Sequence, residues 1–289
     1  MAVYAGRAHA EVMKTWFITG ISTGFGRHLT EQLLSRGDRV AGTIRQPGAA
    51  DDLKAKYGDQ LWTAHLDVTD TAEIRQVVDA AFAELGEGGI DVIVNNAGYG
   101  LMGAAEELTD EQISHQINTN LIGSIQVVRA ALPHLRAQGR GRILQLSSVG
   151  GQAAWPGGSL YHTTKWGIEG FTEALAAEVA PFGIGVTIVE PGGARTEFRY
   201  GSSVLAPKLD AYDASPAARI RGVLTERTAQ SIGDAAKMAT IMIDSVDQEP
   251  APLRLVLGSD AYTAIVGALT DRLAAVQAQR EVAFSTDIG

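Results

Sequence analysis

Short runs of apolar and β-branched residues alternate along most of the chain with longer segments whose apolar residues recur at helical spacing. The runs predict strands at Lys14–Thr19, Arg39–Ile44, Leu61–Leu66, Asp91–Asn95, Arg142–Ser147, Gly185–Glu190 and Leu253–Leu257. The longer segments predict helices at Gly26–Arg36, Thr71–Leu85, Thr109–Arg136, Ser159–Pro181, Gly233–Val246 and Ser259 to about Ala283. Strands that are apolar on both faces and joined through helices form parallel sheets, because right-handed crossovers place helices on both sides. We therefore expect an α/β protein with a doubly wound, seven-stranded parallel sheet and helices on both faces.

The composition argues against several classes of protein. The 289 residues include no cysteine, which excludes disulfides, thiolate metal sites and thiol nucleophiles and fits a reducing compartment. The net charge of -9 repels nucleic-acid phosphates and anionic membrane surfaces. The apolar runs are far shorter than the roughly 20 residues of a bilayer span, and the six histidines have no metal-ligand spacing. We expect a cytoplasmic protein without nucleic-acid, membrane or metal partners.

The chain has the length and pattern of one domain. Its glycines and prolines are spread between apolar segments rather than gathered in a linker, so we expect a single catalytic domain over residues 13–289. Residues 1–12 have charged side chains and no apolar stretch of signal-peptide length, and we interpret them as an N-terminal extension or a cloning remnant. Residues 197–227 interrupt the alternation after the sixth strand, where open parallel sheets bind ligands, so we expect a substrate lid there. An ordinary surface loop is the alternative.

A glycine-rich turn joins the first predicted strand to the first predicted helix. Thr19 is followed by Gly20-Ile21-Ser22-Thr23-Gly24-Phe25-Gly26. Glycine has no Cβ, so such a turn can be tight and can bring the N–H groups of a helix start close to a pyrophosphate. The sequence predicts a dinucleotide-binding turn formed by Gly20, Ser22, Thr23, Gly24, Phe25 and Gly26. A simple loop is the alternative.

Further motifs occur in an order typical of one enzyme family. The turn has the spacing Gly-x-x-x-Gly-x-Gly, Asn95-Asn96-Ala97-Gly98 follows the fourth strand, and Pro191-Gly192 with Thr196 follows the sixth. Between them, Ser148 precedes by 13 residues a Tyr-x-x-x-Lys motif formed by Tyr161 and Lys165. Over residues 14–260 the chain resembles the short-chain dehydrogenase/reductase family, in particular its hydroxysteroid-dehydrogenase-like branch. The resemblance implies a Rossmann fold and an NAD(P)-dependent enzyme acting on CH–OH or C=O groups.

The resemblance implies a reacting site formed by Tyr161, Lys165 and Ser148. A phenol alone is a poor acid/base at neutral pH, but Lys165, on the same helix face, would favour the phenolate of Tyr161 and reach the nicotinamide ribose. Ser148 would hydrogen-bond the substrate oxygen; Ser147 is its rival and would face the other side of the strand. Taken singly, a Tyr–Lys pair is usually a solvated helix face, and a serine after a strand is usually a turn or cap residue.

The resemblance also implies further contacts. Asn120 matches the helix asparagine of the family, whose backbone carbonyl would hold a water linked to the lysine; Asn118 is the competing candidate, and a polar surface position is the alternative for either. Asp67 and Val68 would contact the adenine ring, although Asp67 could equally cap the following helix. The remaining expected cofactor-binding residues are Asn95, Ala97, Gly98, Tyr161, Lys165, Pro191, Gly192, Gly193, Ala194 and Thr196.

The end of the second strand favours NADP(H) over NAD(H). An acidic residue there would bind the free ribose 2′-hydroxyl of NAD. The sequence has Ile44 followed by Arg45, and the next carboxylate is Asp51. Arg45 can pair with a 2′-phosphate; a solvated arginine is the alternative. Ser22 and Thr23 do not provide the second basic residue that NADP-binding relatives often have in the glycine turn.

These observations predict an NADP(H)-dependent oxidoreductase that interconverts a secondary alcohol and a ketone, with Tyr161 as the acid/base. The alternative is a non-catalytic NADP(H)-sensing regulatory protein on the same fold, although such proteins typically lack the Tyr and Lys. Residues 100–102, 152–155 and those from 197 onward are mainly apolar or aromatic, so we expect an apolar alcohol or ketone as substrate. The resemblance implies a homodimer or homotetramer.

Overall fold

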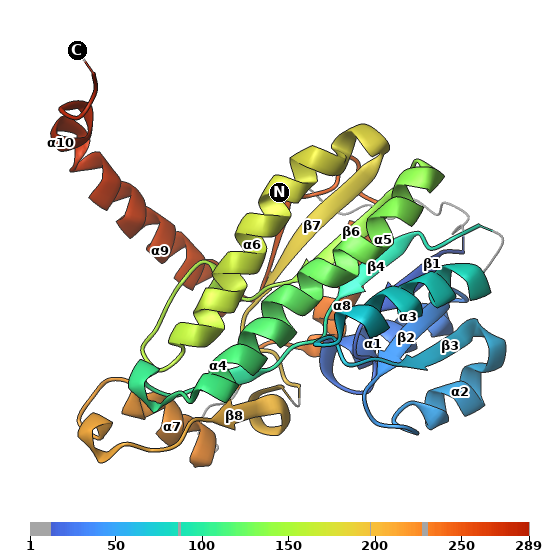
Figure 1. Cartoon of the computed structure of the whole chain (residues 1–289), viewed down its shortest axis with the longest axis horizontal. Helices are drawn as coiled ribbons and strands as arrows, with labels where there is room; N and C mark the ends of the chain where they lie inside the picture. Colours follow the sequence, from blue (N-terminus) through green and yellow to red (C-terminus); the bar gives the residue numbers. More distant parts are fainter. Residues whose placement is uncertain (1–12, 86–87, 197, 227–230, 289) are drawn as a thin grey trace.

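Seven parallel strands form one sheet in the order β3-β2-β1-β4-β6-β7-β9 (Figure 1). The computed structural model describes residues 13–85, 88–196, 198–226 and 231–288; residues 1–12, interpreted above as an extension, lie outside it. The strands are β1 (Thr15–Ile18), β2 (Arg39–Ile44), β3 (Leu61–His65), β4 (Val92–Asn95), β6 (Gly141–Leu146), β7 (Ile184–Pro191) and β9 (Arg254–Leu257). The predicted seven-stranded parallel sheet is confirmed.

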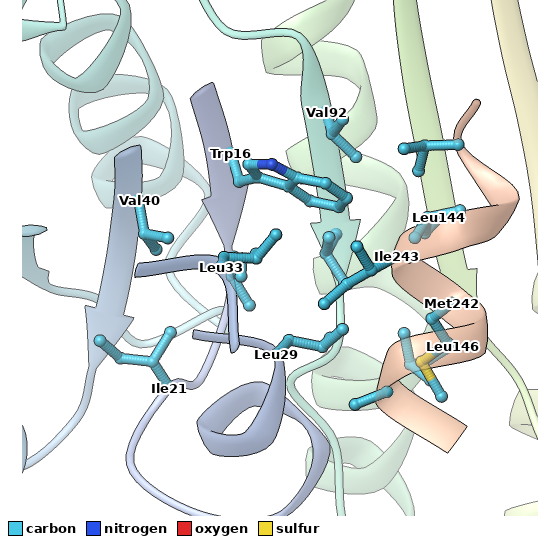
Figure 2. Close-up of a cluster of buried hydrophobic side chains, with 14 of the residues drawn as sticks. Trp16, Ile21, Leu29, Leu33, Val40, Val92, Leu144, Leu146, Met242 and Ile243 are labelled. Atoms are coloured by element: carbon cyan, nitrogen blue, oxygen red, sulfur yellow. The ribbon is translucent and has the colours of Figure 1, made fainter. Parts of the chain in front are cut away.

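Helices cover both faces of the sheet. Neighbouring residues of a strand point to opposite faces, so each strand contributes side chains to two separate cores. Trp16 of β1 packs with α1 (Gly24–Ser35), α2 (Asp51–Tyr57) and α8 (Ala235–Ser245). Phe17, the next residue, packs with α3 (Thr71–Glu84), α5 (Ser124–Gln138) and α6 (Ser159–Val179). Figure 2 shows the first of these cores, where Trp16 lies among Leu33 and Ile243 side chains from helices on one face. The doubly wound arrangement follows from this alternation.

The strand order reverses beside β1. The chain runs outward from β1 to β2 and β3, then returns to β4 on the other side of β1 and continues outward through β6, β7 and β9. At such a switch point the loops after β1 and β4 diverge to opposite faces, which leaves a crevice at the carboxyl ends of the strands. The fold thus brings the predicted glycine turn and the loop after β4 together.

The helix expected over Thr109–Arg136 is divided. It consists of α4 (Asp110–Ile117) and α5, separated by a π-helical turn at Asn118–Gly123. Thr109 caps α4, since its side chain accepts a hydrogen bond from the Gln112 N–H. The last expected helix is likewise divided into α9 (Ser259–Gln277) and α10 (Arg280–Phe284), which project away from the body (Figure 1). None of the described helices is long and apolar enough to cross a bilayer.

The segment from residue 198 to 226, within the expected lid, is more regular than its composition indicates. It contains β8 (Ser203–Leu205), which pairs in parallel with β5 (Gly100–Met102), and α7 (Ala218–Thr225). The buried carboxylate of Glu107 accepts a hydrogen bond from the Leu209 N–H at 3.0 Å and forms an ion pair with Arg221 at 3.2 Å. The segment is therefore fastened to the main body; residues 197 and 227 lie outside the described residues.

Candidate active site

A cavity of about 440 Å³ lies where the loops at the carboxyl ends of the strands meet the 198–226 segment. Residues singled out in the sequence form much of its wall: Gly20, Ser22, Thr23, Gly24, Phe25, Arg45, Asp67, Val68, Ala97, Gly98, Ser148, Tyr161, Lys165, Pro191, Gly192, Gly193, Ala194 and Thr196. Motifs that are far apart in the sequence therefore surround one space. Gly26, Asn95 and Asn120 do not line it.

The turn after β1 has a backbone that requires glycine. Gly20 and Gly24 have φ angles of +75° and +59°, in the left-handed region. A Cβ on Gly26 would lie 2.0 Å from the carbonyl oxygen of Gly20, so α1 can approach the turn this closely only with glycine there. The N-cap residue Thr23 makes no side-chain capping hydrogen bond, which leaves the first N–H groups of α1 without a side-chain partner. This helix start fits an anionic pyrophosphate.

Asn96 connects the loops after β1 and β4. Its amide Nδ2 donates to the carbonyl oxygens of Thr19 and Gly20, both at 2.9 Å. In return, the hydroxyl of Thr19 accepts hydrogen bonds from the N–H groups of Asn96 and Ala97, both at 3.0 Å. The four hydrogen bonds fix the glycine turn against the neighbouring loop, and Asn96 itself lines the cavity.

Asn95, which we expected to bind the cofactor, lies in the core instead. Its Nδ2 donates to the carbonyl oxygen of Ser124 at 2.9 Å and to Oε1 of Gln145 at 3.0 Å. Successive side chains at the end of a strand point in opposite directions, so Asn95 and Asn96 cannot both face the cavity. The sequence contained this signal, because Asn95 occupies an inward position of β4.

Tyr161, Lys165 and Ser148 lie together in the cavity wall. The Lys165 Nζ is 5.8 Å from the centroid of the Tyr161 ring and donates to the carbonyl oxygen of Leu146 at 2.9 Å. The Ser148 Oγ, at the end of β6, accepts a hydrogen bond from the Gly150 N–H at 3.0 Å. All three side chains are buried apart from a small exposed fraction. The helix spacing of four residues and the strand end bring a phenol, an ammonium and a hydroxyl to one place.

The pKa of Tyr161 differs from our expectation. Burial raises the pKa of the phenol to about 12, and a side-chain hydrogen bond with Ser148 opposes this only in part. Burial also lowers the pKa of Lys165 to about 8, opposed by the nearby carboxylate of Glu169. Desolvation disfavours the charged form of either group. The pKa of the phenol is therefore governed by burial, opposed by Ser148, and not by the lowering that we expected from Lys165.

A buried charge cluster lies behind this wall and was not anticipated from the sequence. Ser147, the rival of Ser148, also lines the cavity, but its hydroxyl donates to the carboxylate of Glu169. Arg254 of β9 pairs with Glu169 at 2.7 Å and also with Glu190 of β7. Burial and the adjacent carboxylate of Glu169 raise the pKa of Glu190 to about 7, and Arg254 opposes this. The cluster joins α6, β7 and β9 beneath the candidate site.

Asn120 is buried in the π-helical turn, whereas its competitor Asn118 is exposed. The Asn120 Oδ1 accepts from the Tyr99 N–H at 3.0 Å, and its Nδ2 donates to the Tyr99 carbonyl oxygen at 2.8 Å and to the Thr164 hydroxyl at 3.4 Å. Its own carbonyl oxygen accepts from the Ser124 hydroxyl at 3.3 Å. The side chain thus supports the loop after β4 rather than lining the cavity.

The other end of the cavity contains Arg45 and Asp67. Arg45 is exposed at the rim. The Asp67 carboxylate accepts hydrogen bonds from the N–H and the hydroxyl of Thr69, at 2.9 and 2.8 Å. The hydrogen bond from the Thr69 N–H is the main reason that the pKa of Asp67 is lowered, and the positive charge of Arg45 lowers it further. Asp70, not Asp67, caps α3, so the alternative role of Asp67 as a helix cap does not apply.

Apolar and aromatic side chains form the part of the wall next to Tyr161 and the 198–226 segment. These residues are Tyr99, Met102, Val149, Trp155, Phe198, Ile220, Val223 and Leu224, with hydroxyls from Ser202 and Ser203. Among the described lining residues, the charged ones are Arg45, Asp67 and Lys165. Only Lys165 of these belongs to the reacting end, so this part of the cavity fits a neutral, apolar molecule.

The sheet topology, the glycine turn at the helix start and the Tyr–Lys pair define a nicotinamide-dependent oxidoreductase. A sequence profile described as short chain dehydrogenase matches residues 14–203. The chain is 39% identical over 250 residues to oxidoreductase BOA17 of Botryotinia fuckeliana, over 86% of this chain and 90% of that protein. A crystal structure of a short-chain dehydrogenase from Streptomyces avermitilis matches with a TM-score of 0.88 and 38% identity, over 96% of this chain and 100% of that one. The chain therefore belongs to the short-chain dehydrogenase/reductase family.

The similarity extends to relatives of more specific name. The chain is 39% identical over 181 residues to 3-ketodihydrosphingosine reductase of Bacteroides thetaiotaomicron, over 63% of this chain and 64% of that protein. Membership of the family makes this protein an NAD(P)-dependent oxidoreductase with a small-molecule substrate. The predicted enzyme class is confirmed, whereas the predicted hydroxysteroid-dehydrogenase-like branch stays a prediction.

The cavity fits the dinucleotide that the family uses. The start of α1 and the glycine turn leave room and N–H donors for a pyrophosphate, as described above. In addition, the hydroxyl of Thr119 lines the cavity and is buried without a hydrogen-bond partner among the described residues. Buried hydroxyls are almost always hydrogen-bonded in proteins. An unsatisfied one in the wall is what a site for a polar ligand provides, and the sequence motifs did not single out Thr119.

Proposed function

We propose that the protein is an NADP(H)-dependent oxidoreductase that interconverts a secondary alcohol and a ketone, with Tyr161 as the acid/base. The observation that carries the proposal is the common position of Tyr161, Ser148 and Lys165 in the cavity wall. The phenol and the serine hydroxyl would share one substrate oxygen, because both line the cavity and Ser148 lowers the pKa of Tyr161 through a hydrogen bond. Together they form a hydrogen-bonding site for a carbonyl or hydroxyl group.

In the direction of ketone reduction, NADPH supplies the hydride when it is bound. Tyr161 donates its proton to the carbonyl oxygen, which becomes the hydroxyl of the product. Because burial raises the pKa of Tyr161 to about 12, the phenol holds this proton at neutral pH and is ready to act as the acid. Ser148 hydrogen-bonds the same oxygen as negative charge develops on it. The ammonium of Lys165 stabilises the phenolate that remains.

The cofactor-binding residues we propose extend from the reacting end to the rim. Gly24 and Phe25 would hold the pyrophosphate through the start of α1, and Thr119 and Asn96 would add polar contacts that the sequence motifs had not included. Arg45 would pair with a 2′-phosphate, which favours NADP(H) over NAD(H). The last residue of β2 is Ile44, which has no carboxylate to bind a free 2′-hydroxyl.

The proposed substrate is an apolar ketone or secondary alcohol. The cavity near Tyr161 has aromatic and aliphatic walls, with Trp155 and Phe198 among them. A relative named 3-ketodihydrosphingosine reductase supports reduction of a keto group. The 198–226 segment contributes Ile220 and Leu224 to this wall, so we propose that it acts as the substrate lid of a single catalytic domain.

A homodimer or homotetramer is part of the proposal. Two large apolar residues are exposed beside the long helices α5 and α6. Ile122 precedes α5 and is 38% exposed, and Trp166 lies on α6 and is 42% exposed. Burial of this surface between copies of the chain would be favourable. Light scattering at several protein concentrations measures the assembly directly.

A spectrophotometric assay tests the function. The purified protein is incubated with NADPH or NADH and a panel of ketones that differ in size and charge, and absorbance of the reduced nicotinamide is followed. We expect faster turnover with NADPH and a preference for neutral apolar ketones. Tyr161→Phe should lower kcat about 10²–10⁴-fold and change the affinity for NADPH far less. Cofactor binding without any turnover would instead identify a regulatory protein. Equal rates with both cofactors would contradict the choice of NADP(H).

A further inference from the structure

His162, which follows the tyrosine of the Tyr-x-x-x-Lys motif, joins α6 to the loop after β6. Its Nδ1 lies 2.8 Å from the carbonyl oxygen of Gly150, and its Nε2 accepts a hydrogen bond from the Trp155 N–H at 3.1 Å. The imidazole edge also packs against the Trp155 indole, with ring centroids 4.1 Å apart and planes at 89°. One side chain therefore holds two separate points of the 149–158 segment.

These two hydrogen bonds require one protonation state. The carbonyl oxygen of Gly150 can only accept, so Nδ1 of His162 must carry a hydrogen. The backbone N–H of Trp155 can only donate, so Nε2 must be unprotonated. The neutral Nδ1–H tautomer satisfies both. The imidazolium ion has a hydrogen on each nitrogen and would set Nε2 against the Trp155 N–H, donor against donor.

Glycines on either side of the ring make the contact possible. A Cβ on Gly150 would lie 3.0 Å from Nδ1 of His162 and 3.1 Å from Cε1 of Tyr161. A Cβ on Gly158 would lie 2.9 Å from Nε2 of His162. The imidazole is 5% exposed, so a lost hydrogen bond is not readily replaced by one to water.

Among the described residues, the charged side chains that hydrogen-bond the 149–158 segment are Glu169 and Arg272, and both do so at Gln152 rather than at His162. The 149–158 segment and β5, which both pack against this part of α6, contain no ionisable side chain. On α6 itself the nearest titratable groups are Tyr161, whose ring centroid is 6.0 Å away, and Lys165. Helix α4 also packs on α6 and contains Asp110, Glu111 and His115, but none of these groups contributes to the change in the pKa of His162. Burial lowers the pKa of His162 below its usual 6.5, while its hydrogen bonds with Gly150 and Trp155 oppose this.

The held segment forms part of the proposed substrate site. It begins directly after Ser148, and Val149 and Trp155 line the cavity. A further hydrogen bond, from the Gly103 N–H to the Gly157 carbonyl oxygen at 2.9 Å, connects its far end to the loop after β5. The segment thus places Trp155 in the same cavity wall as Tyr161, whereas Arg45 and Asp67 come from the loops after β2 and β3.

We propose that His162 is a positioning residue which, only as the neutral Nδ1–H tautomer, holds the 149–158 segment and Trp155 in the substrate wall. Protonation of His162 at acidic pH breaks the bond to Trp155 and weakens substrate binding without changing cofactor binding. This inference rests on the proposed function in one respect, the identification of the wall containing Trp155 as the substrate side. The tautomer and its effect on the loop are independent of it.

The first test is NMR spectroscopy of the protein labelled with both ¹⁵N-histidine and ¹⁵N-tryptophan, which needs no substrate. We expect His162, assigned by its loss in His162→Phe, to be the Nδ1–H tautomer at neutral pH and to become protonated only below the usual histidine pKa. The Trp155 N–H resonance should shift in the same pH range. The proposal would be overturned if His162 were the Nε2–H tautomer, or if the Trp155 N–H chemical shift did not change as His162 is protonated. Either result holds whether or not the enzyme reduces ketones.

The second test separates KM from kcat. In the wild type, KM for the ketone should rise at acidic pH as His162 becomes protonated. The Kd for NADPH, whose 2′-phosphate also titrates at about pH 6, should follow the same pH course in the wild type and in His162→Phe. His162→Phe removes both hydrogen bonds of the imidazole, so it should raise KM about tenfold or more and abolish the dependence of KM on this protonation. His134→Phe, which removes a more exposed histidine stacked on Phe82, is the matched control and should leave KM unchanged. The thermal midpoint of each variant checks folding, and an unaltered pH profile in a folded His162→Phe would refute the proposal.

Discussion

Replacement of Arg254 by methionine removes the cation shared by two buried carboxylates. The guanidinium pairs with Glu169 and Glu190, whose side chains are 3% and 1% exposed, and with the exposed Glu173. Removing one partner of a buried ion pair costs about 3–5 kcal/mol. Because the Arg254 side chain is 31% exposed, solvent screens part of the interaction with the carboxylates. We therefore expect Arg254→Met to lower the free energy of unfolding by about 2–3 kcal/mol near pH 8. Methionine keeps most of the alkyl contact, so the change isolates the charge.

The loss should depend on pH in a defined direction. In the folded protein the pKa of Glu190 is about 7, above its usual 4.5. The folded state therefore binds more protons than the unfolded state between these values, and the contribution of Glu190 to stability falls as the pH rises through this window. Arg254 lowers this pKa, so its removal extends the window upward. Near pH 5.5 Glu190 is protonated in the folded variant, and the loss should shrink to about 1 kcal/mol.

Urea unfolding at both pH values measures these differences, provided the slope m is unchanged. Adding Glu190→Gln to Arg254→Met should recover about 1 kcal/mol or more near pH 8, because one unpaired charge is then absent. Lys208→Met is the control, since Lys208 pairs with Asp210 and Asp213 on the surface and such pairs contribute about 0–1 kcal/mol. A loss for Arg254→Met that is equal at both pH values, or no larger than the control, would refute the reasoning.

Three further changes test other parts of the site. Gly26→Ala should weaken NADPH binding about tenfold or more, because its Cβ would meet the Gly20 carbonyl oxygen at 2.0 Å and displace the turn; fluorescence titration of NADPH measures this. Lys165→Met should abolish turnover. It should also raise the free energy of unfolding at pH 7 by about 1–3 kcal/mol, because burial of the charged lysine is unfavourable and lowers its pKa to about 8. A lower free energy of unfolding for this variant in urea would contradict the prediction. Arg45→Ala should raise KM for NADPH about tenfold and leave KM for NADH within twofold; an equal rise for both would exclude a 2′-phosphate contact.

The main sheet was predictable because its strands are buried on both faces. Arg39–Ile44, for example, was expected with the observed bounds, since the short uncharged run Val-Ala-Gly-Thr-Ile ends at Arg45 and is too short for a helix. α2 was missed because Leu53 is the one buried residue of its seven, so its sequence shows almost no apolar period. β5 and β8 were missed for another reason. Each has three residues, and their pairing joins positions about a hundred residues apart, which local pattern cannot reveal.

The candidate site was predictable where a motif prescribes backbone or spacing and less so where burial decides. Gly20 and Gly24 have the left-handed φ that a tight turn requires, and Tyr161 lies one turn from Lys165 as the spacing indicated. The raised pKa of Tyr161 depends on how completely α6 is covered, which no local pattern encodes. The hydrogen bonds of His162 depend on a loop that returns to it, so the sequence, which showed only that the histidines lack metal-ligand spacing, did not predict them.

The π-helical turn at Asn118–Gly123 also determines how this region can vary in length. Each residue of an α-helix advances the side chains by about 100° around the axis. Deleting one residue from the turn would make α4 and α5 a continuous α-helix, but the face that buries Val127 and Leu135 would then be out of phase with the face that buries Gln116. Substitutions at exposed positions keep this phase, whereas single insertions or deletions do not. The number of residues between Gln116 and Val127 is therefore as constrained as the identity of the side chains at either end.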